Sequence, residues 1–266
     1  MSKSNTIEVV NKNTLVSVVQ IVPTPAQGNT PRDIVTDGKY VYVSMYTGVV
    51  SRIDPSTNTI DKTVAVGPNP EEMVIVNKSL YVTNSDGNNY NAGYANGKSV
   101  SKISLSDFVE EKKIAVGLNP TKITADALGN VLVLCMGDYS ATPATVWKIN
   151  AEDEATSMNI PATIMDIKDN SLYVINAPYG APSITYTVYN TSSGAVEKEN
   201  FVSAPVDAPA GIAVHSDGRI FITSYTLVGG FASYKTPGYV SEYSSDGTFV
   251  KKYDVGVGAV SMTFLK

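Results

Sequence analysis

Tyrosine is the chemically active residue type that this 266-residue chain has in quantity, because the usual catalytic and metal-binding residues are scarce. There are 16 tyrosines, but a single histidine, His215, and a single cysteine, Cys135. One histidine cannot form a multi-histidine zinc site, and no serine, histidine and aspartate fall where they would share a site. Cys135 ends an apolar segment without a nearby histidine, which favours a buried structural thiol. The sequence therefore predicts no enzyme activity, no catalytic residue, no metal site and no cofactor.

Aromatic residues gather in the long, irregular segments of the chain. Tyrosine rings offer flat apolar faces and hydroxyl groups at a small entropic cost, which suits sugars, corrin-like rings or a protein partner. The alternative is that many of these rings pack their own loops. Phe231 and Tyr239 belong to the same segments. We expect ligand binding at Tyr46, Tyr90, Tyr94, Tyr139, Tyr179, Tyr225 and Tyr234.

Polar residues, most of them charged, precede several apolar segments at similar positions. If the elements repeat around a ring, these residues converge towards its axis. They would then form either a polar binding site or the hydrated mouth of a central channel, with compensating charges. Three of them, Arg32, Glu72 and Lys122, are predicted to bind ligand. The others in this group are Asp33, Glu71, Thr121 and Asp166.

The elements that would position these side chains are short β-strands in a repeat. Five apolar segments follow turn signals such as Asp37-Gly38 and Asp217-Gly218, and each turn follows another apolar run. Two apolar runs around a tight polar turn are typical of a β-hairpin. The five segments are 40–44, 80–84, 131–135, 172–176 and 220–224.

A third and a fourth strand follow each hairpin. The third strands alternate polar and apolar residues, as in Val49 to Ile53, and the segment Gly-x-Asn-Pro opens the next unit at Gly67 and Gly117. Matched positions recur about 39 to 51 residues apart, which is the period of a four-stranded propeller blade. The sequence thus predicts an all-β chain, a β-propeller of four-stranded antiparallel blades.

The two ends of the chain would share the last blade. Residues 258–264 have the pattern of a sixth first strand, and residues 6–10 and 15–19 have the patterns of a third and a fourth strand. We therefore expect six blades, with seven as the alternative, in one domain over residues 1–266. The last blade would be closed by both termini.

The strand motifs resemble those of the YVTN-type β-propellers. Tyr81-Val82-Thr83-Asn84 spells the signature of that family, and looser forms recur in register at Tyr173 to Asn176 and Tyr42 to Ser44. Segments such as Val66 to Glu71 and Val116 to Thr121 make the chain similar to surface propellers of gut Bacteroidetes. Some of those proteins capture cobalamin and pass it to a TonB-dependent transporter.

The resemblance implies a ligand-capturing propeller of the cell envelope, placed outside the cytoplasm at the outer-membrane surface or in the periplasm. Its ligand would be a corrinoid or a glycan, taken up through the aromatic loops. The N-terminal residues show no apolar signal segment. One alternative function is a scaffold that binds an outer-membrane transporter. Another is a metal-dependent lactonase that recruits Glu72 and Asp166, as some six-bladed propellers do.

Composition excludes other classes of function. The formal net charge is −5 and the basic residues are scattered, so no basic stripe exists for nucleic acid. No stretch reaches the roughly 18 to 20 apolar residues of a transmembrane span. We expect a monomer without a transmembrane segment.

Overall fold

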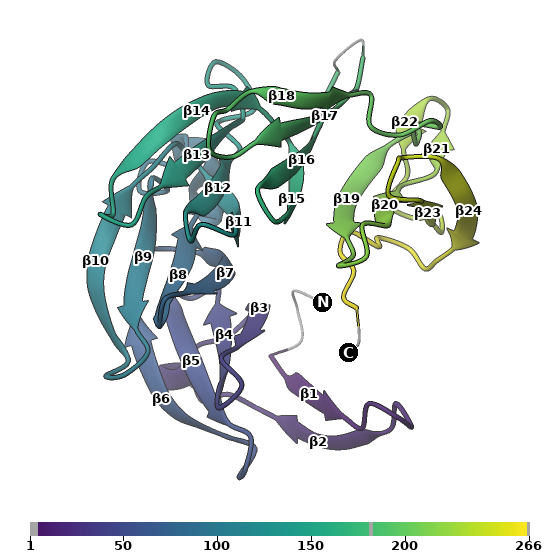
Figure 1. The fold of residues 1–266 in the computed structure, drawn as a ribbon. Coiled ribbons are helices and arrows are strands. Elements are labelled where there is room, and N and C mark those ends of the chain that lie inside the picture. Colours follow the sequence, from purple (N-terminus) through teal and green to yellow (C-terminus); the bar gives the residue numbers. More distant parts are fainter. Residues whose placement is uncertain (1–4, 181–182, 265–266) are drawn as a thin grey trace. The chain divides into compact units, whose positions relative to one another are not determined.

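The structure is a computed structural model that describes residues 5–180 and 183–264, and nearly all of its regular elements are β-strands (Figure 1). Two short 3-10 helices, η1 (Pro25–Gln27) and η2 (Gly87–Ala92), interrupt them. The chain divides into two compact units, which are described separately. The first holds residues up to 125 and residues 129–159, and the second holds residues 126–128 and the chain from 160 onwards. The expectation of a single domain stays a prediction.

The first unit contains three four-stranded antiparallel sheets and the hairpin β1 (Ile7–Val10) and β2 (Ser17–Ile21). In each four-stranded sheet the strands lie in chain order, as the repeat predicts. The strands are β3 (Pro31–Thr36), β4 (Val41–Met45), β5 (Val49–Asp54) and β6 (Thr59–Ala65); β7 (Pro70–Val76), β8 (Ser79–Asn84), β9 (Ser99–Ser104) and β10 (Val109–Ala115); and β11 (Pro120–Ala125), β12 (Val131–Cys135), β13 (Thr145–Ile149) and β14 (Ala155–Pro161).

The second unit contains two more sheets of the same kind. A small hairpin, β21 (Leu227–Val228) and β22 (Phe231–Ala232), is inserted between the second and third strands of the last sheet. The sheets comprise β15 (Ile164–Lys168), β16 (Ser171–Asn176), β17 (Thr185–Asn190) and β18 (Val196–Glu199); and β19 (Pro209–Val214), β20 (Ile220–Ser224), β23 (Tyr239–Tyr243) and β24 (Phe249–Asp254).

The apolar cores lie between neighbouring sheets. In the first unit, β8 is buried because one sheet covers each of its faces: Leu80 packs towards β4 and Tyr81 packs towards β12. The outer strand β24 is exposed throughout. In the first unit, Tyr42 and Val50 of one sheet pack with Met73 and Leu80 of the next. This arrangement explains why second strands are continuous apolar runs and why the fourth strands are polar.

The C-terminal segment differs from the prediction. Residues 258–264 form no strand. Instead, the carbonyl oxygen of Val260 lies close to Gly211 of β19, and Phe264 packs edge-on against His215 with 4.7 Å between ring centroids. The alternation of residue types in this segment therefore does not indicate a strand. The segment packs irregularly on the sheet that contains β19.

Candidate functional site

The passages between sheets and the loops between second and third strands share one face of the first unit. The amide of Ser85, after β8, donates to the carbonyl of Asn69, before β7, at 3.1 Å. The next sheet repeats this bond, from Met136 to Asn119 at 2.9 Å. The predicted aromatic loops therefore lie beside the Gly-x-Asn-Pro passages, and together they form what we call the loop face.

Glycine and asparagine of the passage have separate physical roles. A Cβ added at Gly67 would lie 2.4 Å from the Asn84 side chain, so only glycine allows this close approach. Asn69 takes a left-handed conformation, with φ of 48°, which asparagine tolerates better than most residues. Its side chain donates to the carbonyl of Tyr46 at 2.9 Å and accepts the amide of Asn88 at 3.0 Å. One asparagine thus connects two loops of neighbouring sheets.

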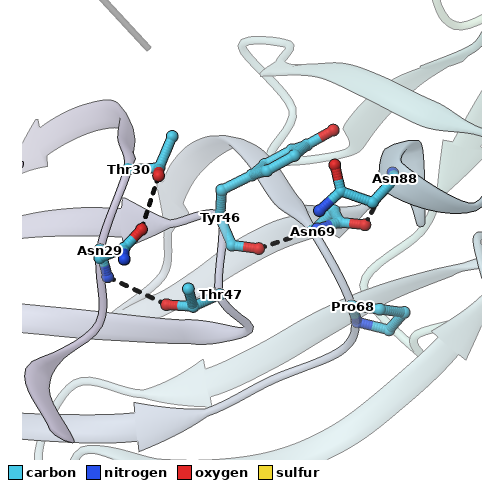
Figure 2. A pocket seen from close by; sticks show the side chains of 7 residues that line it. All are labelled: Asn29, Thr30, Tyr46, Thr47, Pro68, Asn69 and Asn88. Atoms are coloured by element: carbon cyan, nitrogen blue, oxygen red, sulfur yellow. Dashed lines mark hydrogen bonds between the residues drawn. The ribbon is translucent and has the colours of Figure 1, made fainter. Parts of the chain in front are cut away.

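A hollow of about 390 Å³ lies between these loops (Figure 2). Its lining carries carboxamide and hydroxyl groups and one aromatic ring, and none of its side chains is charged. The residues are Asn29, Thr30, Tyr46, Thr47, Pro68, Asn69 and Asn88. The hydrogen bonds found in the described part of the chain leave the Asn88 carboxamide free, because only its backbone amide is used.

Tyr46 stands at this hollow with one ring face against a cation. The Arg32 guanidinium carbon lies 4.9 Å from its ring centroid, and Arg32 in turn donates to Glu71, with Nε 2.7 Å from Oε2. Glu71 is largely buried and also accepts from Ser85 Oγ at 3.3 Å. Burial, followed by the neighbouring Glu71, raises the pKa of Tyr46. The ring is therefore held in a fixed orientation as a neutral phenol.

One ion pair and one bond to a backbone amide involve the other charged residues of these first strands. Lys122 Nζ of β11 lies 2.5 Å from Glu72 Oε1 of β7. Asp33 of β3 accepts the backbone amide of Met73 at 2.8 Å and so ties one first strand to the next. The Lys122–Glu72 pair is compatible with a mouth of compensating charges, and both alternatives stay predictions.

Asp166 does not belong with this group. It lies opposite Tyr173 in its own sheet, at the level of Val35 opposite Tyr42, whereas Asp33 lies opposite Ser44. Asp166 is therefore two residues nearer the hairpin turn, where it accepts the amide of Val214 at 2.7 Å. The expectation of an equivalent position was wrong, because the strand register places Ile164, not Asp166, at the level of Asp33.

The partly buried carboxyl group of Asp33 gives a pH-dependent prediction. Burial raises its pKa despite the bond from Met73, with Glu72 and Lys122 as its charged neighbours. In the unfolded chain this carboxyl group ionises at about pH 4. The folded protein binds more protons above that pH, so stability falls as the pH rises from there through the folded pKa. We expect Asp33→Asn, which keeps an acceptor for Met73, to lack this fall in thermal unfolding from about pH 3.5 to about pH 7. If the melting temperatures of wild type and Asp33→Asn changed with pH in the same way, the assignment would be contradicted.

The remaining predicted tyrosines are distributed over both units. Tyr90 and Tyr94 belong to the η2 loop, and Tyr94 lies near Tyr139, with 6.3 Å between ring centroids. In the second unit, Tyr225 and Tyr234 stack edge-on at 4.9 Å, and Tyr179 is 95% exposed. Tyr239, expected in a loop, instead begins β23 and is buried.

The amide residues of the hollow were missed by the sequence reasoning. Asn69 and Asn119 stand in the repeated Gly-x-Asn-Pro segments, so a signal was present, but it indicated a turn and not a lining residue. Asn88 lies in a loop whose course no periodicity specifies. Cys135 is buried as predicted, and burial raises the pKa of its thiol to about 12.

The described ranges lack two other kinds of feature. Within residues 5–180 and 183–264, no three His, Cys, Asp or Glu side chains are grouped closely enough to hold a metal ion. In the same ranges, no helix combines the length and the apolar character needed to cross a bilayer.

Comparisons with known proteins identify the fold. A scan against models of protein families finds no match, and neither does a search of curated proteins. Solved structures do match. Kuenenia stuttgartiensis hydrazine synthase has 18% identity over 86% of this chain and 67% of its own, with a TM-score of 0.62. The dihydro-heme d1 dehydrogenase NirN has 12% identity over 96% of this chain and 52% of its own, with a TM-score of 0.60.

A third match is a Bacteroides caccae protein of unknown function, with 16% identity over 95% of this chain and 91% of its own, at a TM-score of 0.60. Such low identities carry information about fold alone. Hydrazine synthase and NirN are propeller-like, and the five sheets described above have the strand order of propeller blades. The chain is a β-propeller of four-stranded antiparallel blades.

Proposed function

We propose that this protein is a non-enzymatic binding propeller that holds the end of a neutral glycan, or a similar polyhydroxylated small molecule, in the hollow of the loop face. The observation that supports the proposal is the lining of the hollow, which combines one oriented tyrosine ring with uncharged amides and hydroxyls. A sugar ring presents an apolar face for stacking and a rim of hydroxyls for hydrogen bonding. The tyrosine ring of the hollow is complementary to the apolar face of a sugar, and its amides and hydroxyls are complementary to the sugar hydroxyls.

Pre-organisation of the lining favours affinity. Arg32 holds the Tyr46 ring on one side, and Asn69 joins the loops of two sheets through its side chain. Few side chains would have to be ordered when a ligand binds, which lowers the entropic cost of association. Asn88 and Thr47 are exposed, and each carries a polar group at the rim.

The size of the hollow favours a small ligand. A volume of about 390 Å³ lies near the lower end of the range for ligand pockets. One or two sugar rings suit this volume. A corrinoid, the ligand suggested by the family resemblance, is the alternative and would have to spread over the neighbouring aromatic residues Tyr90, Tyr94 and Tyr139.

The setting we propose is the bacterial cell envelope, where the bound ligand would be passed to an outer-membrane transporter. This part rests on the YVTN-like motifs, such as Tyr81 to Asn84. The similarity to a Bacteroides caccae structure is compatible with it, at the level of fold.

Calorimetric titration tests the site. Wild-type protein is titrated with neutral mono- and disaccharides and separately with cobalamin. We expect Tyr46→Ala to weaken sugar binding roughly ten- to a hundredfold, because the stacking face is lost. Asn88→Ala should weaken it about fivefold, the value of one hydrogen bond. Asn13→Ala removes an exposed asparagine of the β1–β2 hairpin and serves as the control.

The outcome separates the ligands. Sugar binding that is unchanged in both hollow variants would refute the site. Binding of cobalamin alone, weakened by loss of Tyr90 or Tyr139, would support the corrinoid alternative.

A further inference from the structure

The small hairpin β21–β22 presents large apolar side chains to solvent, and the proposed sugar site does not use it. Phe231 is 70% exposed, Val228 is 58% exposed and Leu227 is 41% exposed. Exposed apolar residues in one short segment mark a contact surface more often than isolated ones do. The hairpin therefore has the character of a contact surface.

The tip of the hairpin stands clear of the rest of the chain. Its two-residue turn consists of Gly229 and Gly230, with φ of 61° and 85°, and a Cβ added at either would meet no atom within 4 Å. Val228 and Leu227 are neighbours in one strand and point to opposite faces of the hairpin. Because both are exposed, the apolar surface surrounds the tip and is not confined to one face.

The two strands of the hairpin are paired with each other near the tip. Leu227 pairs with Ala232, and Val228 pairs with Phe231. Below them, the amide of Ser233 donates to the carbonyl of Thr226 at 2.9 Å, and the Thr226 hydroxyl donates to the carbonyl of Pro237 at 2.8 Å. Pairing within the hairpin lowers the cost of bringing its backbone into a less polar layer.

Polarity increases from the tip to the base in the order found at a membrane surface. From Tyr225 to Tyr234 the sequence contains no charged residue. At the base, Tyr225 and Tyr234 stack edge-on, and the exposed Lys235 follows directly. Tyrosine rings are enriched at the headgroup level of bilayers, and lysine extends its ammonium group towards the phosphates.

We propose that the β21–β22 hairpin inserts its apolar tip into the surface of a phospholipid bilayer, with the Tyr225–Tyr234 pair at the level of the headgroups. A lipid environment can cover both faces of the hairpin, whereas a flat protein surface covers one. With a net charge of −5, the chain gains nothing overall from anionic lipids, so zwitterionic phosphatidylcholine is the matching surface. The inference is independent of the sugar site, which lies in the other unit.

Flotation of the full chain with phosphatidylcholine vesicles tests the proposal. We expect wild-type protein to float with the vesicles, and Phe231→Asp to lower the partition coefficient by about tenfold or more, because the charge opposes insertion. Leu128→Asp adds the same charge at another exposed apolar residue, 64% exposed, and should float like wild type. Circular dichroism melting confirms that each variant is folded.

A second readout reports insertion directly. Phe231→Trp places a fluorophore at the tip, and we expect its emission to shift to shorter wavelength when vesicles are added. Trp147, the single natural tryptophan, gives the background in wild type. Equal flotation of wild type and Phe231→Asp, or no shift for Phe231→Trp, would overturn the proposal. So would concentration-dependent self-association that Phe231→Asp abolishes, since that result assigns the hairpin to a second copy of this chain.

Discussion

Replacing Phe201 by alanine is expected to lower the free energy of unfolding by about 3 to 5 kcal/mol, the usual cost of removing a fully buried phenylalanine. Phe201 is 1% exposed and lies edge-on to Tyr173 and Tyr186, with ring centroids 5.3 and 5.8 Å away. Truncation leaves a cavity and removes both aromatic contacts. Urea unfolding followed by circular dichroism measures the change.

The segment that carries Phe201 explains why relaxation would be limited. It connects β18 to β19 and is anchored by tyrosine hydroxyls. Tyr243 donates to the carbonyl of Ala204 at 2.5 Å, and Tyr186 donates to that of Val206 at 3.3 Å. A segment held in this way cannot collapse into the cavity. Phe231→Ala, at an exposed phenylalanine, is the control, and equal loss of stability in both variants would contradict the assignment of Phe201 to the core.

Replacing Gly97 by alanine is expected to displace the η2 loop and weaken ligand binding at the hollow. A Cβ at Gly97 would lie 2.0 Å from the carbonyl oxygen of Ser85, a backbone atom that cannot move without its strand. Since Asn88 and the loop tyrosines follow Ser85, the hollow would lose its shape. Sugar titration and thermal melting measure the effect, and we expect a fall in both affinity and melting temperature.

The same loop contains a matched control. Gly93 has φ of 66°, but a Cβ there would meet nothing within 4 Å. Gly93→Ala should therefore cost only the left-handed conformation, roughly 1 to 2 kcal/mol, and leave binding intact. If Gly97→Ala bound sugar like wild type, the dependence of the hollow on this close approach would be disproved.

The sheets could be predicted from the sequence because short-range signals specify them. Tight turns such as Asp37-Gly38 separate apolar runs, and the buried second strands follow as continuous apolar segments. Predictions from sequence patterns failed where tertiary packing, and not periodicity, determines the structure. Residues 258–264 alternate like a strand yet form none, and Phe201 lies outside every strand yet fills a core.

The candidate site was partly predictable for the same reason. Tyr46 was identified because aromatic residues in long loops are chemically distinctive. Asn88 was not, because its position depends on the bond from its amide to Asn69, a contact between residues 19 positions apart. Asp166 was misplaced by two residues, a shift that only the strand register reveals.

The tight passages between sheets have a consequence for changing the protein by design. Gly67 to Pro70 are fixed by a close approach and by bonds to two loops, so a peptide inserted there would separate adjacent sheets. At the exposed tip of the η2 loop, around Gly93, an added Cβ would meet no atom within 4 Å, so no such close approach opposes an insertion there. New recognition sequences could therefore be grafted into the long loops while the framework retains its spacing, much as variable segments are exchanged on an antibody domain.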